Sequence, residues 1–469
     1  LVRRSDPIPG LDATGDFSGR ARYELPEVIS QYAVEFLVQL GEYDTIAARH
    51  AAYYTDFLSA HYPHLLGGKQ PEALRAIGAE IENIRAAWQW STLHLEPDDV
   101  GLVRIARSLN PLFQFYDMRS WFQEGATLFA QTAARLAPWL KTDAIANDAT
   151  DYAIVHAKVQ ARWGWFAFHL GRHAESRTLL EESLARLRAF NVEAESVFNL
   201  NYLGAVLRHL GEFAAAETRL QAGLALAQKH DDRLSASIAL NTLGQLASLQ
   251  GDLERAQTFC RQALTIKREI GDRWGMTYSL TYLGRVVQAT GDYGAAQKLF
   301  EESLAICQEI GDQRGAAFAL QNLADTAHLS GQFSAAQTHY QASLQIYRTI
   351  GSRADVSLTL ARIGAVACAQ GDYSLADKRL REALGLAWSV QATPSLLASV
   401  LGLAALAIAT GQPEQAWPPL QLVYHHPASS QQQKQQAEQL MATLPAATNT
   451  PAPATTLEAY VQMQLSVYR

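Results

Sequence analysis

The sequence predicts an all-α protein, an α-solenoid of stacked helix hairpins that repeat every 40 residues and follow a further helical region. Three observations support this prediction. Glycine recurs every 40 residues from position 171 to 411, small residues recur in phase with it, and the segments between them place apolar residues three and four positions apart. This spacing is typical of amphipathic helices, whereas propeller blades of a similar period would need alternating strands.

Each 40-residue unit is expected to form two antiparallel helices. Leu240, Leu243 and Ala247 make the apolar stripe of one first helix. Gly251-Asp252 then ends it, because glycine tolerates the left-handed conformation and the acid suits the start of the second helix. Two helices can approach closely where both lack bulk. The turn glycines are Gly171, Gly211, Gly251, Gly291, Gly331, Gly371 and Gly411; the small register seven residues earlier is Gly164, Gly204, Gly244, Gly284, Ala324, Gly364 and Ala404; the register five residues after the turn glycine is Ser176, Ala216, Ala256, Ala296, Ala336, Ala376 and Ala416.

The order of these registers resembles the tetratricopeptide repeat. One unit reads Leu243-Gly244, then the turn, Ala256 and Cys260, and the resemblance covers about 155–425. It implies a right-handed superhelix whose concave surface is lined by the first helix of each unit. The unit has 40 residues rather than about 34, which lengthens each helix by less than a turn. The proline that ends the family's second helix is missing, so Gly271, Gly311 and Gly351 are expected to end it. A HEAT-type repeat also fits the length but lacks the Leu-Gly and Ala pattern.

The first third of the chain resembles a different family segment. Its motifs are Arg22-Tyr23-Glu24-Leu25 with Tyr32-Ala33, then Arg49-His50-Ala51-Ala52-Tyr53-Tyr54, then Asn83-Ile84-Arg85-Ala86-Ala87. These resemble the segment that follows the nucleotide-binding (NB-ARC) and winged-helix modules of bacterial STAND-class signal-transduction ATPases, just before their repeats. The resemblance implies the sensor half of a cytoplasmic regulator. Since the chain starts at Leu1 rather than Met, we expect these modules to lie upstream.

No nucleotide-binding loop is expected in this chain. The pattern GxxxxGK[ST], whose backbone amides hold phosphates, is missing. Gly67-Gly68-Lys69-Gln70 is the nearest stretch, and we expect it to be a solvated loop between helices. The chain is therefore expected to bind no ATP.

The expected organisation is sequential. An N-terminal arm covers 1–22 and a helical linking region 23–150, and seven repeats cover 151–428. A polar capping helix covers 429–445, a linker 446–456, and a short amphipathic helix 457–469.

The composition argues against several classes of binding partner. The net charge of −7 argues against coating nucleic acid or a membrane, and no apolar run reaches ~18 residues. Cys260, Cys307 and Cys368 form no CxxC pair, so neither a disulfide scaffold nor a zinc ribbon is expected. We expect a cytoplasmic protein without cofactor, membrane or direct nucleic-acid contact, monomeric alone and able to oligomerise in an active full-length form.

Catalysis would require a cluster of nucleophile, base and orienting group. The sequence offers none. His425-His426 is expected to be solvated, because adjacent residues point apart on a helix, and Glu181-Glu182 and Glu301-Glu302 recur on second helices as a solvated face. We predict no catalytic or metal-binding residue.

Binding is the more promising function. Positions flanking the small register on the first helices hold amides, tyrosines and arginines, where a merely solvated face would hold more Lys and Glu. Such groups suit an extended peptide, a protein segment or a polyhydroxylated small molecule. The leading hypothesis is a sensor that relays a ligand to the upstream nucleotide switch; the alternative is a constitutive scaffold. The predicted ligand-binding residues are Asn201, Tyr202, Arg208, Asn241, Gln245, Tyr282, Arg285, Gln288, Gln321, Asn322, Asp325, His328 and Arg362.

Overall fold

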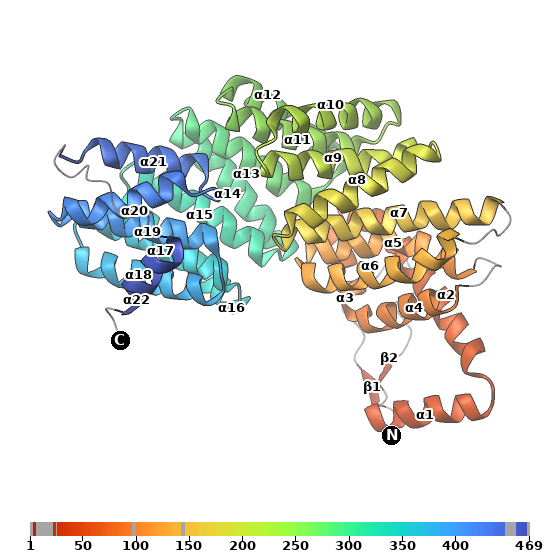
Figure 1. The fold of residues 1–469 in the computed structure, drawn as a ribbon. Coiled ribbons are helices and arrows are strands. Elements are labelled where there is room, and N and C mark those ends of the chain that lie inside the picture. Colours follow the sequence, from red (N-terminus) through yellow and green to blue (C-terminus); the bar gives the residue numbers. More distant parts are fainter. Residues whose placement is uncertain are drawn as a thin grey trace. The chain divides into compact units, whose positions relative to one another are not determined.

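The fold is described from a computed structural model, which covers residues 3–5, 22–24, 26–95, 100–141, 146–445 and 456–466. Nearly all of these residues are helical (Figure 1). The all-α fold class is therefore confirmed. A two-stranded antiparallel pair, in which Arg4 lies opposite Tyr23, is the exception.

The elements follow one another along the chain as β1 Arg3–Ser5, β2 Arg22–Glu24, α1 Glu27–Gln39, α2 Tyr43–Leu65, α3 Gln70–Ala79, α4 Ile81–Leu93, α5 Val100–Met118, α6 Phe122–Leu136, the 3₁₀ helix η1 Ala137–Lys141, α7 Ala146–His169, α8 His173–Ala189, α9 Glu193–His209, α10 Phe213–Lys229, α11 Arg233–Leu249, α12 Leu253–Ile270, α13 Arg273–Ala289, α14 Tyr293–Ile310, α15 Gln313–Leu329, α16 Phe333–Thr349, α17 Arg353–Ala369, α18 Tyr373–Ser389, α19 Thr393–Ala409, α20 Pro413–His425, α21 Gln431–Ala442 and α22 Leu457–Ser466. From α7 to α20 they alternate as first and second helices of successive hairpins.

The small register brings the two helices of a hairpin together. A Cβ atom at Gly204 would lie 2.4 Å from the side chain of Leu220, and one at Gly284 would lie 2.6 Å from Phe300. Real Cβ atoms do not approach other atoms so closely, so only glycine fits here without a shift. The alanine register beside this contact is fully buried, as at Ala216. The sequence prediction of close hairpin packing is confirmed, with the large residue four positions after the alanine as the main contact.

Glycine also ends the helices as expected. Gly251 and Gly291 between paired helices have φ values of +84° and +86°, and Gly271 and Gly311 between successive hairpins have +73° and +72°. Residues that carry a side chain rarely adopt such positive φ values, so glycine is favoured at these positions. The acid that follows caps the next helix: Asp292 Oδ1 accepts from the Ala295 amide at 2.9 Å.

The described chain forms two compact units. Unit 1 comprises residues 1–247 and 258–279, and unit 2 comprises 248–257 and 280–469. In unit 1, helices α2 to α7 share an aromatic-rich core that includes Trp88, Phe115, Phe129 and Phe166. In unit 2, the core continues to the last helix, α22, which buries Tyr460 and Val461.

The division into domains stays a prediction. Residues 446–455 and most of 1–22 lie outside the described residues. At the C-terminal end, α21 begins with a capping box between Ser430 and Gln433, and the Arg381 guanidinium of α18 donates to Gln464 Oε1 of α22 at 3.1 Å. Among the described helices none is both long and apolar enough to cross a membrane.

Candidate ligand-binding surface

The candidate surface lies on the first helices of the hairpins. We define the A face as the positions two before and one after the small register on α7, α9, α11, α13, α15 and α17. These positions are one helical turn apart and share one side of the helix, whereas the small register faces the second helix. The A face of unit 1 carries Arg162, Trp165, Tyr202, Ala205, Thr242 and Gln245, and that of unit 2 carries Tyr282, Arg285, Asn322, Asp325, Arg362 and Ala365.

Three of the predicted binding residues serve the packing of repeats instead. Asn201, Asn241 and Gln321 stand three before the small register and are 2%, 6% and 2% exposed. Their amide groups donate to the following first helix: to the Ser235 carbonyl at 2.9 Å, the Ser279 hydroxyl at 2.8 Å and the Thr359 hydroxyl at 2.6 Å. Because their donors are used between repeats, we leave these three residues out of the proposed site and call them the staple residues.

Two further predicted residues are also held by the protein itself. Gln288 donates to the Thr326 hydroxyl at 2.8 Å, again across neighbouring repeats. Asn322 is 6% exposed and donates to the Phe318 carbonyl one turn earlier at 2.7 Å. Each of these side-chain amides therefore already uses one donor within the protein.

The A face of unit 2 has a charged pair at its centre. Asp325 accepts from Arg362 on the next first helix and from the Tyr340 hydroxyl. Both charged side chains remain about one-third exposed, at 31% and 32%. Beside them, burial lowers the pKa of His328, an effect that the Asp325 carboxylate opposes. The pair thus offers a carboxylate and a guanidinium whose mutual contact fixes their positions.

Arg285 is the outstanding cation of this surface. It is exposed, and within the part of the chain that the structure describes it forms neither a hydrogen bond nor an ion pair. Tyr282 lies one turn before it and is half-buried. Phe318, which the sequence prediction missed, is 38% exposed one turn before Asn322. An unpaired guanidinium, a carboxylate–guanidinium pair and an exposed phenyl ring therefore lie on neighbouring helices.

In unit 1 the predicted residues lie in a more enclosed setting. The Tyr202 ring centroid lies 4.1 Å from that of Trp165 and 4.2 Å from that of Phe198. Burial raises the pKa of the Tyr202 hydroxyl, and the neighbouring Asp117 carboxylate adds to this. Arg208 and Gln245 are both half-buried.

A buried ionic cluster adjoins these rings, and the sequence prediction missed it. The Arg162 guanidinium lies 4.0 Å from the Phe198 ring centroid and donates to Asn110 Oδ1 at 2.8 Å and Glu195 Oε2 at 3.1 Å. Lys158 Nζ lies 2.7 Å from the other oxygen of Glu195. The sequence could have indicated this cluster. Arg162 and Trp165 stand at the two A-face positions of α7, one repeat before the first predicted binding residues.

Asp117 of α5 is the most perturbed carboxyl group of unit 1. It is 7% exposed, and its Oδ1 accepts from Trp165 Nε1 at 3.0 Å. Burial raises the pKa of Asp117 to about 7, against the effect of that hydrogen bond. This carboxyl group is therefore partly protonated near neutral pH.

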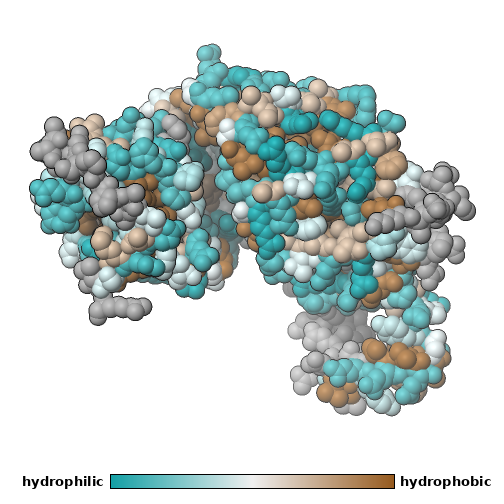
Figure 2. All heavy atoms as spheres, in the orientation of Figure 1, coloured by the Kyte–Doolittle hydropathy of each residue, from teal (hydrophilic) through white to brown (hydrophobic). Residues whose placement is uncertain are grey.

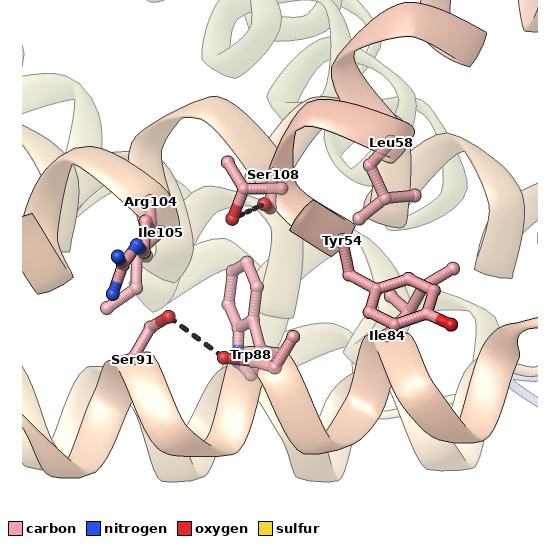
Figure 3. A pocket seen from close by; sticks show the side chains of 10 residues that line it. Tyr54, Leu58, Ile84, Trp88, Ser91, Arg104, Ile105 and Ser108 are labelled. Atoms are coloured by element: carbon pink, nitrogen blue, oxygen red, sulfur yellow. Dashed lines mark hydrogen bonds between the residues drawn. The ribbon is translucent and has the colours of Figure 1, made fainter. Parts of the chain in front are cut away.

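Two cavities among the described residues lie away from the A face. A cavity of about 10 Å³ lies among α2, α4 and α5, and its polar lining includes Thr55, Ser91, Arg104 and Ser108. Figure 3 shows the last three of these side chains around it. This volume fits one water molecule. The hydroxyls of Ser91 and Ser108 donate to protein oxygens, so they are oriented for structure. An open depression of about 610 Å³ lies between α18 and α22 in unit 2.

Within the described ranges, no group of three or more His, Cys, Asp or Glu side chains is arranged to hold a metal ion. Cys260 and Cys307 are buried thiols that are not joined in a disulfide, and burial raises the pKa of the Cys260 thiol to about 12. The thiol of Cys260 thus stays protonated and unreactive, and its role is to pack between the helices.

Residues 193–269 and 276–349 match the family model described as tetratricopeptide repeat. The hairpins from α9 to α16 are tetratricopeptide repeats. A protein of Mycobacterium tuberculosis provisionally named as an HTH-type transcriptional regulator is 31% identical over 154 residues. A Mycobacterium bovis protein with the same provisional name gives the same figures. The match covers 29% of this chain and only 17% of either regulator.

One solved structure extends the likeness of the fold, and a second has a lower score. A Rap protein complexed with Competence and Sporulation Factor has a TM-score of 0.56 at 12% identity, over 85% of this chain and 99% of that chain. A STAND protein with a tetratricopeptide repeat sensor from Pyrococcus horikoshii has a TM-score of 0.46 at 13% identity, over 83% of this chain and 54% of that chain. At these identities the comparisons concern the fold alone.

Proposed function

We propose that this chain is a non-enzymatic ligand-sensing domain, which binds an extended peptide or protein segment on the A face of unit 2. The observation that carries the proposal is the exposed, unpaired guanidinium of Arg285 beside the Asp325–Arg362 pair and the Phe318 ring. A solenoid presents such side chains in rows on successive helices, which suits an extended ligand. A carboxylate next to an apolar side chain is the chemistry that this surface complements.

The relay belongs to the same proposal. In the resemblance to STAND-class regulators, the ligand would bias a nucleotide switch in upstream NB-ARC and winged-helix domains. By linkage, the ligand shifts such a switch only by its difference in affinity between the two states. The Rap protein of similar fold was solved in complex with Competence and Sporulation Factor, which supports a binding role for this fold by analogy.

A charge reversal tests the site. Random peptides of about twelve residues would be selected against the whole chain from a display library, and the affinities of the enriched peptides would be measured by fluorescence anisotropy. We expect enrichment of Asp or Glu near an apolar residue. Arg285→Glu should weaken these peptides by about tenfold or more, because a hydrogen bond to a charged group contributes about 1.5–3 kcal/mol.

The matched control is Lys298→Glu. Lys298 is exposed on α14, the second helix of the same hairpin, and its reversal changes the net charge equally. We expect peptide affinity to stay within about twofold of the wild-type value. Equal losses in both variants, or no loss at Arg285→Glu, would place the peptides elsewhere. Charge reversal at Arg362 would be a less specific test of the site, because it also breaks the pair with Asp325.

A further inference from the structure

Unit 1 contains a polar contact between segments that lie 202 residues apart in the sequence. The side chain of Gln70, at the start of α3, is fully buried. Its Nε2 donates to Asp272 Oδ1 at 3.1 Å and to the Leu65 carbonyl at 2.8 Å, while its Oε1 accepts from the Trp274 amide at 2.8 Å. All the hydrogen-bonding groups of this amide are thus engaged at the turn between α12 and α13.

The expectation of a solvated loop at 67–70 was therefore wrong for Gln70. Gly68 and Lys69 are exposed, but the backbone of this loop lies against the repeat turn. A Cβ atom on Gly271 would lie 3.4 Å from the Gly68 amide nitrogen. The two backbones thus meet in ordinary van der Waals contact, and glycine is favoured at 271 by its φ of +73°.

Asp272 combines an ordinary and an unusual role. Its Oδ1 caps α13 by accepting from the Gly275 amide at 2.8 Å, as Asp312 caps α15 through Gly315 at the same distance. Its Oδ2 lies 3.4 Å from Lys267 Nζ, and both side chains are 6% exposed. Lysine is seldom buried unless it is paired.

The lysine is specific to this repeat. The equivalent positions one repeat earlier, one later and two later hold Ala227, Cys307 and Tyr347, which are buried. A buried ion pair adds little net stability compared with apolar packing, because both charges lose hydration. Lys267, Asp272 and Gln70 are therefore arranged for a specific polar contact, one that water can replace when the segments separate.

The end of α2, which the contact holds, also lies near the A face of unit 1. Phe198 and Trp274 pack against the aromatic core of helices α2 to α7. Tyr62, near the end of α2, has its pKa raised by burial and lies within electrostatic range of Arg162, Glu195 and Asp232. The end of α2 and the loop after it thus occupy the side of the repeats on which a ligand would lie.

We propose that Gln70, Lys267, Asp272 and the Trp274 amide form a releasable latch. Closed, it holds the end of α2 and the loop after it beside the A face of unit 1 and keeps that part of the face from external ligands. Open, it hydrates the ion pair and lets the loop and Tyr62 move away from Arg162 and Glu195. This autoinhibitory contact is independent of the site proposed on unit 2.

Hydrogen exchange on the whole chain, read by mass spectrometry, tests the latch. The Trp274 amide is the best reporter, since it lies in the first turn of α13, where the helix offers it no acceptor. Gln70→Ala should raise exchange about tenfold or more at Trp274 and also in 65–70, with the rest of unit 1 unchanged. Gln70→Asn, which keeps the amide but shortens its reach, should give the same pattern more weakly.

The aspartates provide the matched control. Asp272→Asn should raise exchange in 65–70, because it removes the charge that Lys267 and Gln70 contact. Asp312→Asn changes the equivalent cap one repeat later and should leave 65–70 unchanged. Unchanged exchange at Trp274 in Gln70→Ala would show that the contact is absent in solution. Faster exchange throughout unit 1 would make Gln70 an ordinary core residue. Either result overturns the latch.

Discussion

The A faces of the two units carry equivalent positions in different surroundings. Arg162 in unit 1 and Arg362 in unit 2 both stand two residues before the small register, five repeats apart. The side chain of Arg162 is 4% exposed, whereas that of Arg362 is 32% exposed. Each pairs with a carboxylate of a neighbouring first helix. The same repeat position is thus a buried structural ion pair in one unit and an accessible one in the other.

The difference comes from what lies on each face. In unit 1 the chain's own N-terminal helices lie against this face: Phe113 of α5 packs on Phe198, and Tyr62 of α2 lies within electrostatic range of Arg162. In unit 2, Phe318 is 38% exposed and Arg285 is exposed. Apolar surface is also exposed elsewhere in unit 1, on α1, where Val28 and Tyr32 are 74% and 66% exposed (Figure 2). Repetition in sequence therefore does not imply repetition in function.

The largest expected effect concerns Asp117, the carboxyl group buried in unit 1. Its pKa is raised to about 7 by burial, from 3.8 in the unfolded chain. The protonated form is favoured by folding, so its contribution to stability is complete below about pH 3.8 and is lost as the pH rises through about 7. Asp117→Asn keeps an acceptor for Trp165 Nε1 without the charge, and should be more stable than the wild type at pH 8 by up to ~4 kcal/mol.

Urea denaturation of both proteins at pH 5, 6, 7 and 8 measures this effect. The stability difference between Asp117→Asn and the wild type should widen from pH 5 to pH 7 and level off towards pH 8. Parallel pH profiles would mean that the Asp117 carboxylate is hydrated in the folded protein. The strongest electrostatic difference between the two units would then be absent.

The next effect compares the equivalent arginines directly. Arg162→Met leaves Glu195 with Lys158 alone in a buried setting, which should cost about 3 kcal/mol or more. Arg362→Met removes a pair that is one-third exposed, and should cost about 1 kcal/mol or less. Urea denaturation followed by circular dichroism gives both values. Similar costs would show that the covering of unit 1 does not exclude water.

The fold could be predicted from sequence because the hairpin contact repeats. Gly204 and Gly284 are required by close approach, and Gly271 and Gly311 by positive φ, so each requirement leaves a residue every 40 positions. The packing contacts of the staple residues were not predicted, because Asn241 is adjacent in sequence to an A-face position but faces the next repeat. The sequence did contain a signal for these contacts. A hydroxyl residue stands 38 positions after an amide residue of the preceding repeat, as Ser279 does after Asn241.

Non-periodic contacts could not be predicted in this way. Gln70 and Asp272 lie 202 residues apart, and no spacing rule connects them. Only Lys267, a lysine at a position that is otherwise apolar, indicated that the packing there differs. Exposure could not be predicted from the sequence either. Phe318 and Phe198 occupy the same position in their repeats, yet Phe318 is exposed and Phe198 is half-buried.

The smallest expected effect tests what the two units share. Gln321→Ala in unit 2 removes the bond to the Thr359 hydroxyl and should cost about 1 kcal/mol. Asn241→Ala in unit 1 removes the equivalent bond to Ser279, but also removes a buried Oδ1 that has no partner within the described structure, so its cost should be smaller. The same urea titrations would rank them. If Asn241→Ala were instead the costlier change, the covering of unit 1 would extend to the packing between its repeats, and the units would differ in their cores as well as on their A faces.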